Sequence, residues 1–142
     1  MRTLHVGLRV ADLERSLAFY TGLGYEVLGS VPETEFGRLT MLKLPGDEFV
    51  TIELVHDPRR GVVDPGGLNH LVIQVESMHE TTGRLTARGV HVEGPGSPDG
   101  SADLRTAWIT DPDGYRIELV QWPAGHPDGM TAADFGDQVV GD

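Results

Sequence analysis

The chain has 142 residues, a formal net charge of −11 at pH 7 and no cysteine. The negative charge argues against a nucleic-acid-binding protein, which would need clustered Lys and Arg, and the lack of cysteine excludes disulfides, thiolate nucleophiles and cysteine-ligated zinc. No apolar run approaches the roughly 20 residues of a membrane-spanning helix, and no signal-peptide pattern follows Met1, so we expect one cytoplasmic globular domain over residues 1–142.

The first half of the sequence predicts a βαβββ module over residues 4–57. In chain order the predicted elements are a strand over 4–10, a helix over 12–20 and strands over 25–28, 39–44 and 49–55. Asp12 caps the helix at its start, and Gly22 and Gly24 are expected to end it.

The second half predicts the same order of elements over residues 69–122. They are a strand over 69–76, a helix over 78–88 that Gly89 ends, and strands over 90–92, 104–110 and 115–121. A linker rich in Pro and Gly, residues 58–68, joins the two modules. Residues 123–142 form a tail that contains Asp but no Lys or Arg, and its role is left open by the residues.

Because the order βαβββ occurs twice, the predicted fold class is α+β, with two modules forming a paired, mostly antiparallel half-barrel. Alternation along the strands places His5, Arg9 and Glu53 on one face of the first sheet, which no helix covers. The opposite face carries an apolar set that is expected to pack against the helix: Val6, Leu8, Val10, Ile52 and Leu54. Trp108 and Phe49 are also expected in the core.

The two modules repeat their chemically active residues. His5 aligns with His70 and Glu53 with Glu118, at an offset of 65 residues in both cases, and Ile52-Glu53-Leu54-Val55 repeats as Ile117-Glu118-Leu119-Val120. An isolated histidine is usually a structural or surface residue, which is how we interpret His56, His79, His91 and His126. Two His–Glu pairs on equivalent strands instead provide a donor set for one divalent metal, and Zn²⁺, Ni²⁺ and Co²⁺ all suit it.

Segments at both ends of the sequence resemble bacterial glyoxalase I (lactoylglutathione lyase), a family of the vicinal-oxygen-chelate (glyoxalase/bleomycin resistance/dioxygenase) superfamily. The resemblance is carried by residues 1–21, by Ile52-Glu53-Leu54, by Asn69-His70-Leu71 and by the closing segment at 108–119, and it extends to about residue 122. Related dioxygenases have two His and one Glu, epimerases have a Gln at the position of Glu53, and bleomycin-binding proteins generally lack the ligands.

The resemblance implies the roles of individual residues. The metal ligands would be His5, Glu53, His70 and Glu118. The metal would bind both oxygens of a hemithioacetal of a 2-oxoaldehyde, such as methylglyoxal, and hold the enediolate formed when a Glu removes a proton. We expect Glu118 to be that base, with Glu53 serving the opposite face or remaining a ligand.

Arg9 matches a family residue that grips a carboxylate of glutathione, and Arg105 is a second candidate for contact with a substrate anion. The simpler interpretations are an ion pair of Arg9 with Glu53 or Asp57, and a solvated Arg105. Two positions depart from the glutathione-using members. Asp57 stands where they usually have Asn, and Gly66 where they often have Arg. The physiological thiol is therefore left open by the sequence.

The sequence thus predicts a metal-dependent lyase or isomerase of the glyoxalase I type that acts on a small molecule, without nucleic-acid or membrane partners. The alternatives are a ligand-sequestering resistance protein of the bleomycin-binding type, and a metal-dependent epimerase or dioxygenase. In many relatives the site is shared between two chains, His5 and Glu53 of one meeting His70 and Glu118 of the other. We therefore expect a homodimer.

Overall fold

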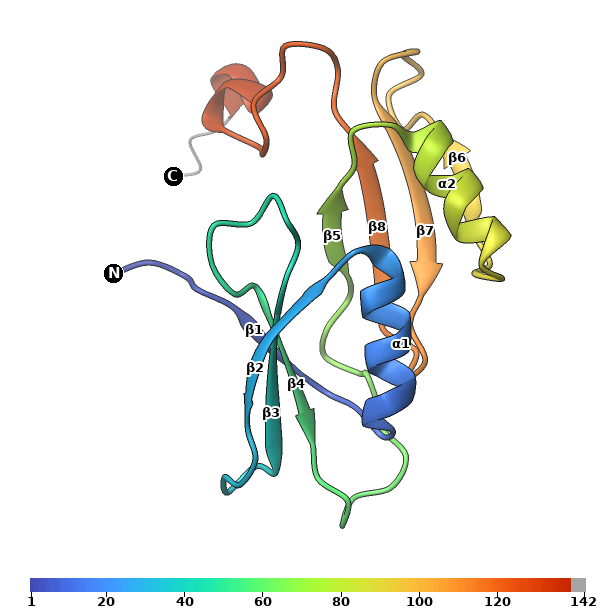
Figure 1. Cartoon of the computed structure of the whole chain (residues 1–142). Helices are drawn as coiled ribbons and strands as arrows, with labels where there is room; N and C mark the ends of the chain where they lie inside the picture. Colours follow the sequence, from blue (N-terminus) through green and yellow to red (C-terminus); the bar gives the residue numbers. More distant parts are fainter. Residues whose placement is uncertain (139–142) are drawn as a thin grey trace. The chain divides into compact units, whose positions relative to one another are not determined.

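The computed structural model describes residues 1–138, and within them the chain divides into two compact units (Figure 1). The first unit contains residues 1–69 together with 110–115, and the second contains 70–109 together with the described residues from 116 to 138. The last part of the predicted tail, residues 139–142, lies outside the described residues. No helix within residues 1–138 is long and apolar enough to cross a membrane.

The first unit holds one helix and a four-stranded sheet. Its elements are β1 (Val6–Arg9), α1 (Leu13–Leu23), β2 (Glu26–Val31), β3 (Arg38–Lys43) and β4 (Ile52–His56). The strands lie in the order β1-β4-β3-β2. β1 and β4 run parallel, whereas β3 is antiparallel to both β4 and β2.

The first helix extends to Leu23, three residues past its predicted end at residue 20. The side chain of Asp12 accepts a hydrogen bond from the backbone N–H of Arg15, as expected of an N-cap. Gly22 lies inside α1 and does not end it. The helix ends at Gly24, which has a φ of 118°, because only a residue without Cβ adopts this left-handed cap conformation at low cost.

The apolar residues of the first unit form its core largely as predicted. Leu8, Val10, Ile52 and Leu54 are buried, and they are joined by Tyr20 and Leu42. Val6 was expected among them but is 38% exposed, because it begins a strand that has a neighbour on one side only. Phe49 was also expected in the core, yet its side chain is 52% exposed and the Arg2 guanidinium lies 5.5 Å from its ring.

The second unit repeats this arrangement and adds a short helical segment. Its elements are β5 (Leu71–Gln74), α2 (Met78–Ala87), β6 (Glu93–Gly96), β7 (Arg105–Thr110), β8 (Arg116–Gln121) and the 3-10 segment η1 (Ala132–Gln138). The strands lie in the order β5-β8-β7-β6. β6 begins later than the predicted strand over 90–92, since Val90 is still used at the end of the helix, where its N–H bonds to the carbonyl of Leu85.

The two modules share their strand register. In the first, Gly7 lies opposite Glu53, and in the second Val72 lies opposite Glu118, again an offset of 65 residues for both members of the pair. The helices also start at equivalent positions, capped by Asp12 and by Ser77. The predicted α+β class, with two βαβββ modules, is confirmed.

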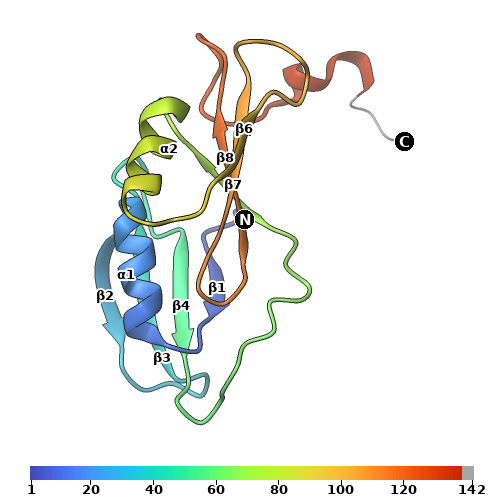
Figure 2. The same cartoon turned by 90° about the vertical axis from the view of Figure 1, so that its right-hand side faces the viewer.

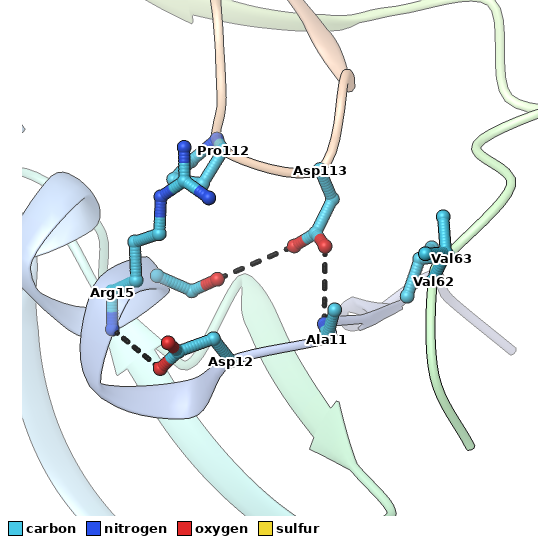
Figure 3. Close-up of a pocket in the computed structure, with 8 residues that line it drawn as sticks. Ala11, Asp12, Arg15, Val62, Val63, Pro112 and Asp113 are labelled. Carbon is cyan, nitrogen blue, oxygen red and sulfur yellow. Dashed lines mark hydrogen bonds between the residues drawn. The ribbon is translucent and has the colours of Figure 1, made fainter.

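A turn from the second half of the sequence is built into the first unit. The buried carboxylate of Asp111 accepts a hydrogen bond from the hydroxyl of Tyr20 at 2.7 Å and others from the backbone N–H groups of Asp113 and Tyr115. Burial raises the pKa of Asp111 above its usual range. Asp113 in turn accepts bonds from the N–H of Ala11 and the hydroxyl of Ser16 (Figure 3). This turn therefore anchors the start of α1.

We predict that Asp111→Ala lowers the free energy of unfolding by about 3 kcal/mol, because it leaves one buried hydroxyl and two N–H groups without their acceptor. Tyr20→Phe removes only one of these bonds and is expected to cost about 1 kcal/mol. Urea denaturation measures both values. The control is Asp103→Ala at an exposed position, where a change within about 0.5 kcal/mol is expected; equal stability of the two Asp→Ala variants would contradict the prediction.

Candidate functional site

The first predicted ligand pair is formed within the first unit. The Nε2 atom of His5 lies 3.0 Å from the Oε2 atom of Glu53. Glu53 is held by β4, and His5 immediately precedes β1, so the parallel pairing of these strands brings together two residues that are 48 positions apart. The side chains are 32% and 16% exposed, and both are therefore accessible to a ligand.

The sheet surface beside Glu53 is sparsely covered by side chains. Across the strands Gly7 lies opposite Glu53, Glu53 opposite Met41, and Met41 opposite Gly29. The two glycines contribute no side chain to this row. A Cβ at Gly29 would have no atom within 4 Å, and one at Gly7 would meet only Val55, at 3.5 Å. In this row Met41 is thus the one residue that adds a side chain beside Glu53.

The second pair is formed within the second unit. The Nε2 atom of His70 lies 3.3 Å from the Oε2 atom of Glu118, and the two side chains are 31% and 22% exposed. The geometry therefore resembles that of the first pair in distance and in accessibility, as the shared strand register requires.

An aromatic residue that we had expected in the core lies beside this second pair. The ring of Trp108 meets that of His70 edge to face, with 4.9 Å between the ring centroids. The guanidinium of Arg116 lies 5.2 Å from the centre of the Trp108 ring and pairs with Glu93 at 2.5 Å. The alternation of side chains along β7 could have predicted this position. Ala107 and Ile109 are buried on one face of the sheet, so Trp108 between them must lie on the other face.

The structure brings the four predicted ligands together two by two. Among residues 1–138, no group of three or more His, Asp or Glu side chains lies close enough to hold a metal ion. Each His–Glu pair is therefore half of the predicted donor set.

Arg9 does not form the ion pair with Glu53 or Asp57 that was its simpler interpretation. One terminal nitrogen of its guanidinium (Nη1) is buried and has no hydrogen-bond partner among the described residues. Its backbone carbonyl accepts a bond from the hydroxyl of Tyr115 at 2.9 Å, which fixes the end of β1. A buried guanidinium nitrogen without a partner is costly and is expected to attract an anion. Arg105, by contrast, is exposed, and its Nε bonds to the carbonyl of Ala102.

The carboxylate of Asp57 is committed to its own loop. It accepts hydrogen bonds from the backbone N–H, Nε and Nη2 atoms of Arg59, and Arg60 lies 3.9 Å away. The hydrogen bonds from Arg59 lower the pKa of Asp57 to about 2. Asp57 thus stabilises the chain after β4. Both of its carboxylate oxygens already accept hydrogen bonds from Arg59 and are not free to bind a ligand.

Two cavities lie in the first unit, and neither is lined by His5 or Glu53. Gly66, at the position where glutathione-using relatives often have Arg, lines a cavity of about 150 Å³ together with residues of β1. A second cavity, of about 220 Å³, lies at the start of α1 (Figure 3). Its carboxylates, Asp12 and Asp113, already accept hydrogen bonds from the helix. The carboxylates of this second cavity therefore hold the start of α1 in place, and we do not assign a ligand to it.

A βαβββ module that occurs twice, each time with one His–Glu pair, is the pattern that the sequence resemblance predicted. Comparison with known protein families leads to the same superfamily. The chain belongs to the Glyoxalase/Bleomycin resistance protein/Dioxygenase superfamily, whose model matches residues 2–119.

Individual relatives show which members of this superfamily the chain resembles. The lactoylglutathione lyase of Salmonella typhimurium is 34% identical over 125 residues, which cover 85% of this chain and 93% of that protein. The trypanothione-dependent glyoxalase I of Leishmania major is 30% identical and has a TM-score of 0.69, covering 85% of this chain and 86% of that one. TnmS3, an antibiotic binding protein from Streptomyces sp. CB03234, is 27% identical with a TM-score of 0.67, covering 87% and 98%. The prediction of an enzyme similar to lactoylglutathione lyases is confirmed.

The pairing of Asp57 with Arg59 predicts a pH-dependent effect on stability. Because the pKa of Asp57 falls from its usual 3.8 to about 2, its contribution is present above about pH 4 and is lost as the pH falls through 2. Asp57→Asn should therefore unfold at lower urea concentration than the wild type at pH 7, and this difference should shrink between pH 4 and pH 2. Arg59→Met should show the same pH dependence. A difference that stays constant with pH would show that the ion pair contributes nothing.

Proposed function

We propose that this protein is a metal-dependent lyase of the glyoxalase I type. Its reaction converts the hemithioacetal of a 2-oxoaldehyde and a thiol into a 2-hydroxyacyl thioester through an enediolate. The observation that supports this most directly is the recurrence of one His–Glu pair in both modules, at 3.0 and 3.3 Å and in the same strand register. The lactoylglutathione lyases among the relatives support the reaction class.

The donor set fits a divalent metal ion. In each pair one imidazole nitrogen and one carboxylate oxygen already lie at contact distance and remain accessible, so one cation placed between them would replace the hydrogen bond with two coordinate bonds. His5, Glu53, His70 and Glu118 would together supply four ligands, which suits Zn²⁺, Ni²⁺ or Co²⁺. When bound, the metal would act as a Lewis acid toward the two oxygens of the substrate.

The carboxylate of Glu118 is proposed as the base. It takes the proton from the carbon that carries sulfur, and the same proton returns to the neighbouring carbon. The first carbon thereby becomes the thioester carbonyl and the second carries the hydroxyl, so no oxidant or reductant is needed. Glu53 occupies the equivalent position in the other module and either serves the opposite face of the substrate or remains a ligand.

Arg9 is proposed to bind an anionic group of the thiol, since its buried nitrogen has no partner in the described part of the chain. Arg105 is exposed and would contact the substrate at the periphery of the site. The oxygens of Asp57 are engaged by Arg59, and Gly66 offers no side chain, so two positions used by glutathione-dependent relatives are not available here. We infer that the thiol need not be glutathione, and methylglyoxal is the proposed aldehyde.

The division of the ligands into two pairs supports the predicted homodimer. A metal with four protein ligands needs both pairs, and we propose that the site is shared, with His5 and Glu53 of one chain and His70 and Glu118 of its partner.

The first test is catalysis with a defined metal. Protein loaded with Zn²⁺, Ni²⁺ or Co²⁺ is assayed with methylglyoxal and several thiols by following thioester formation. We predict activity with at least one thiol, and a loss of about 10²–10⁴-fold in kcat for Glu118→Gln. Glu76→Gln changes an exposed glutamate of the same unit and should have no effect. Full activity of Glu118→Gln would exclude this residue as the base.

The same experiment separates the lyase from a binding protein. The similarity to TnmS3, an antibiotic binding protein, makes sequestration of a ligand the second candidate function. Inactivity with every thiol, combined with tight binding of a bulky drug-like compound by calorimetry, would favour that candidate.

The shared site is tested by mixing two inactive variants. His5→Ala and Glu118→Ala chains are unfolded together and refolded at equal concentration. In a heterodimer with shared sites one site carries both changes and the other carries none, so about a quarter of the wild-type activity is expected to return. Neither variant refolded alone should recover activity. If each chain instead contained a complete site, the mixture would remain inactive.

A further inference from the structure

The segment that follows β8 lies beyond the residues matched by the family model, and it folds back onto the second unit. We call residues 123–138 the strap. The strap is attached at two points: the ring of His126 stacks on that of Trp122 with 4.4 Å between centroids, and the side-chain N–H of Gln74 donates to Asp128 at 3.2 Å. Figure 2 shows α2 on one side of this sheet and η1, the end of the strap, on the other.

Both attachment points belong to the face of the sheet that carries the second His–Glu pair. Gln74 follows His70 and Val72 at alternate positions of the β5 segment, and Trp122 follows Glu118 and Val120 at alternate positions along and just beyond β8. The opposite face presents Ile117 and Leu119, which are buried. The strap therefore binds to the site-bearing face, at the end where β5 and β8 finish.

The two acceptors beside His126 favour a protonated ring. Its Nδ1 atom lies 2.6 Å from the carbonyl oxygen of Pro127, and its Nε2 atom lies 2.5 Å from a carboxylate oxygen of Asp134. Both partners accept hydrogen bonds and neither donates one. A neutral imidazole has one N–H and can satisfy only one of them, whereas an imidazolium donates to both.

The surroundings of the ring also favour the protonated form. A cation stacked on an indole is attracted to the face of the ring, as in the Trp122–His126 stack. The hydrogen bond to Asp134 raises the pKa of His126 above its ordinary value of 6.5. Asp134 is the charged group of η1 that meets the ring, while β8 contributes the uncharged Trp122 and β5 reaches the strap through the neutral Gln74.

Trp122 is held in this stack without a hydrogen bond from its indole to the described residues. The indole Nε1 of Trp122 is buried and has no hydrogen-bond partner within residues 1–138. Burying a donor without an acceptor is unfavourable. Protonation of His126 favours the contacts that its ring makes with Pro127, Asp134 and Trp122, whereas the bond from Gln74 to Asp128 does not involve this ring.

We propose that the strap is a proton-dependent latch over one end of the site-bearing face, held by the imidazolium of His126 and released when this ring loses its proton. Because attachment raises the affinity of the ring for a proton, the latched state predominates below the ordinary pKa of 6.5 and is lost as the pH rises through the raised value. Its effect on catalysis rests on the proposed function, but the latch itself can be measured without substrate.

The experiment uses the fluorescence of Trp122. The chain has 2 tryptophans, so Trp108→Phe leaves Trp122 as the sole indole. A protonated imidazole stacked on an indole quenches it, and we expect emission to rise as the pH increases, with a midpoint above 6.5. In the same background Asp134→Asn should lower the midpoint, and His126→Gln should abolish the transition. His91→Gln, which changes an exposed histidine of the same unit, should leave it intact.

Hydrogen exchange of residues 123–138, corrected for intrinsic rates, provides a second measurement that does not depend on fluorescence. Protection in the wild type should fall over the same pH range and should be low at every pH in His126→Gln, while α2 remains protected in both. A pH-independent wild type, or a transition that survives His126→Gln, would overturn the proposal. Neither result bears on thioester formation, so failure of the latch and failure of the lyase are distinguishable.

Discussion

The parallel pairing of the first and last strands of each module is the constraint on which the site depends. Because Gly7 lies opposite Glu53 and Val72 opposite Glu118, the histidine two residues before each of these edge-strand residues reaches the glutamate of the neighbouring strand. A slip of one residue in this register would turn the glutamate toward the buried face, where Ile52 and Leu54 now lie. The apolar residues that alternate with each glutamate therefore hold the site in register as well as forming the core.

The two pairs share this register but differ in what surrounds them. His70 is packed against Trp108, which is backed by Arg116 and Glu93, so its ring is held on one side by a rigid aromatic. The row of residues around Glu53 contains Gly7 and Gly29 instead, so two of its positions carry no side chain. The two pairs are similarly exposed, and they differ in the aromatic contact that only His70 makes. This difference arises from side chains that do not repeat.

The sequence was most informative where chemistry and periodicity repeat together. The offset of 65 residues aligned the pairs and the helix starts, and alternation placed both glutamates on the face opposite the apolar core. It was less informative where a contact joins residues far apart without a repeat. The hydrogen bond from Tyr20 to Asp111 joins residues 91 positions apart, and the sequence around either residue does not predict it. Val6 and Phe49 were misplaced because apolar character does not reveal where a strand begins. The attachment of the strap depends on single contacts between otherwise ordinary polar residues.

The turn at 110–115 determines how this chain can be cut into fragments that keep their contacts. It comes from the second repeat, yet it supplies the acceptor for Tyr20 and, through Tyr115, the donor to the carbonyl of Arg9. A fragment that stops at Asn69 would retain all five regular elements of the first module and still leave a buried hydroxyl unsatisfied. A fragment cut at the boundary between the two repeats would thus be less stable than the first unit of the intact chain. Dissection of this fold therefore has to follow the spatial units, which include residues 110–115 in the first, and not the repeats of the sequence.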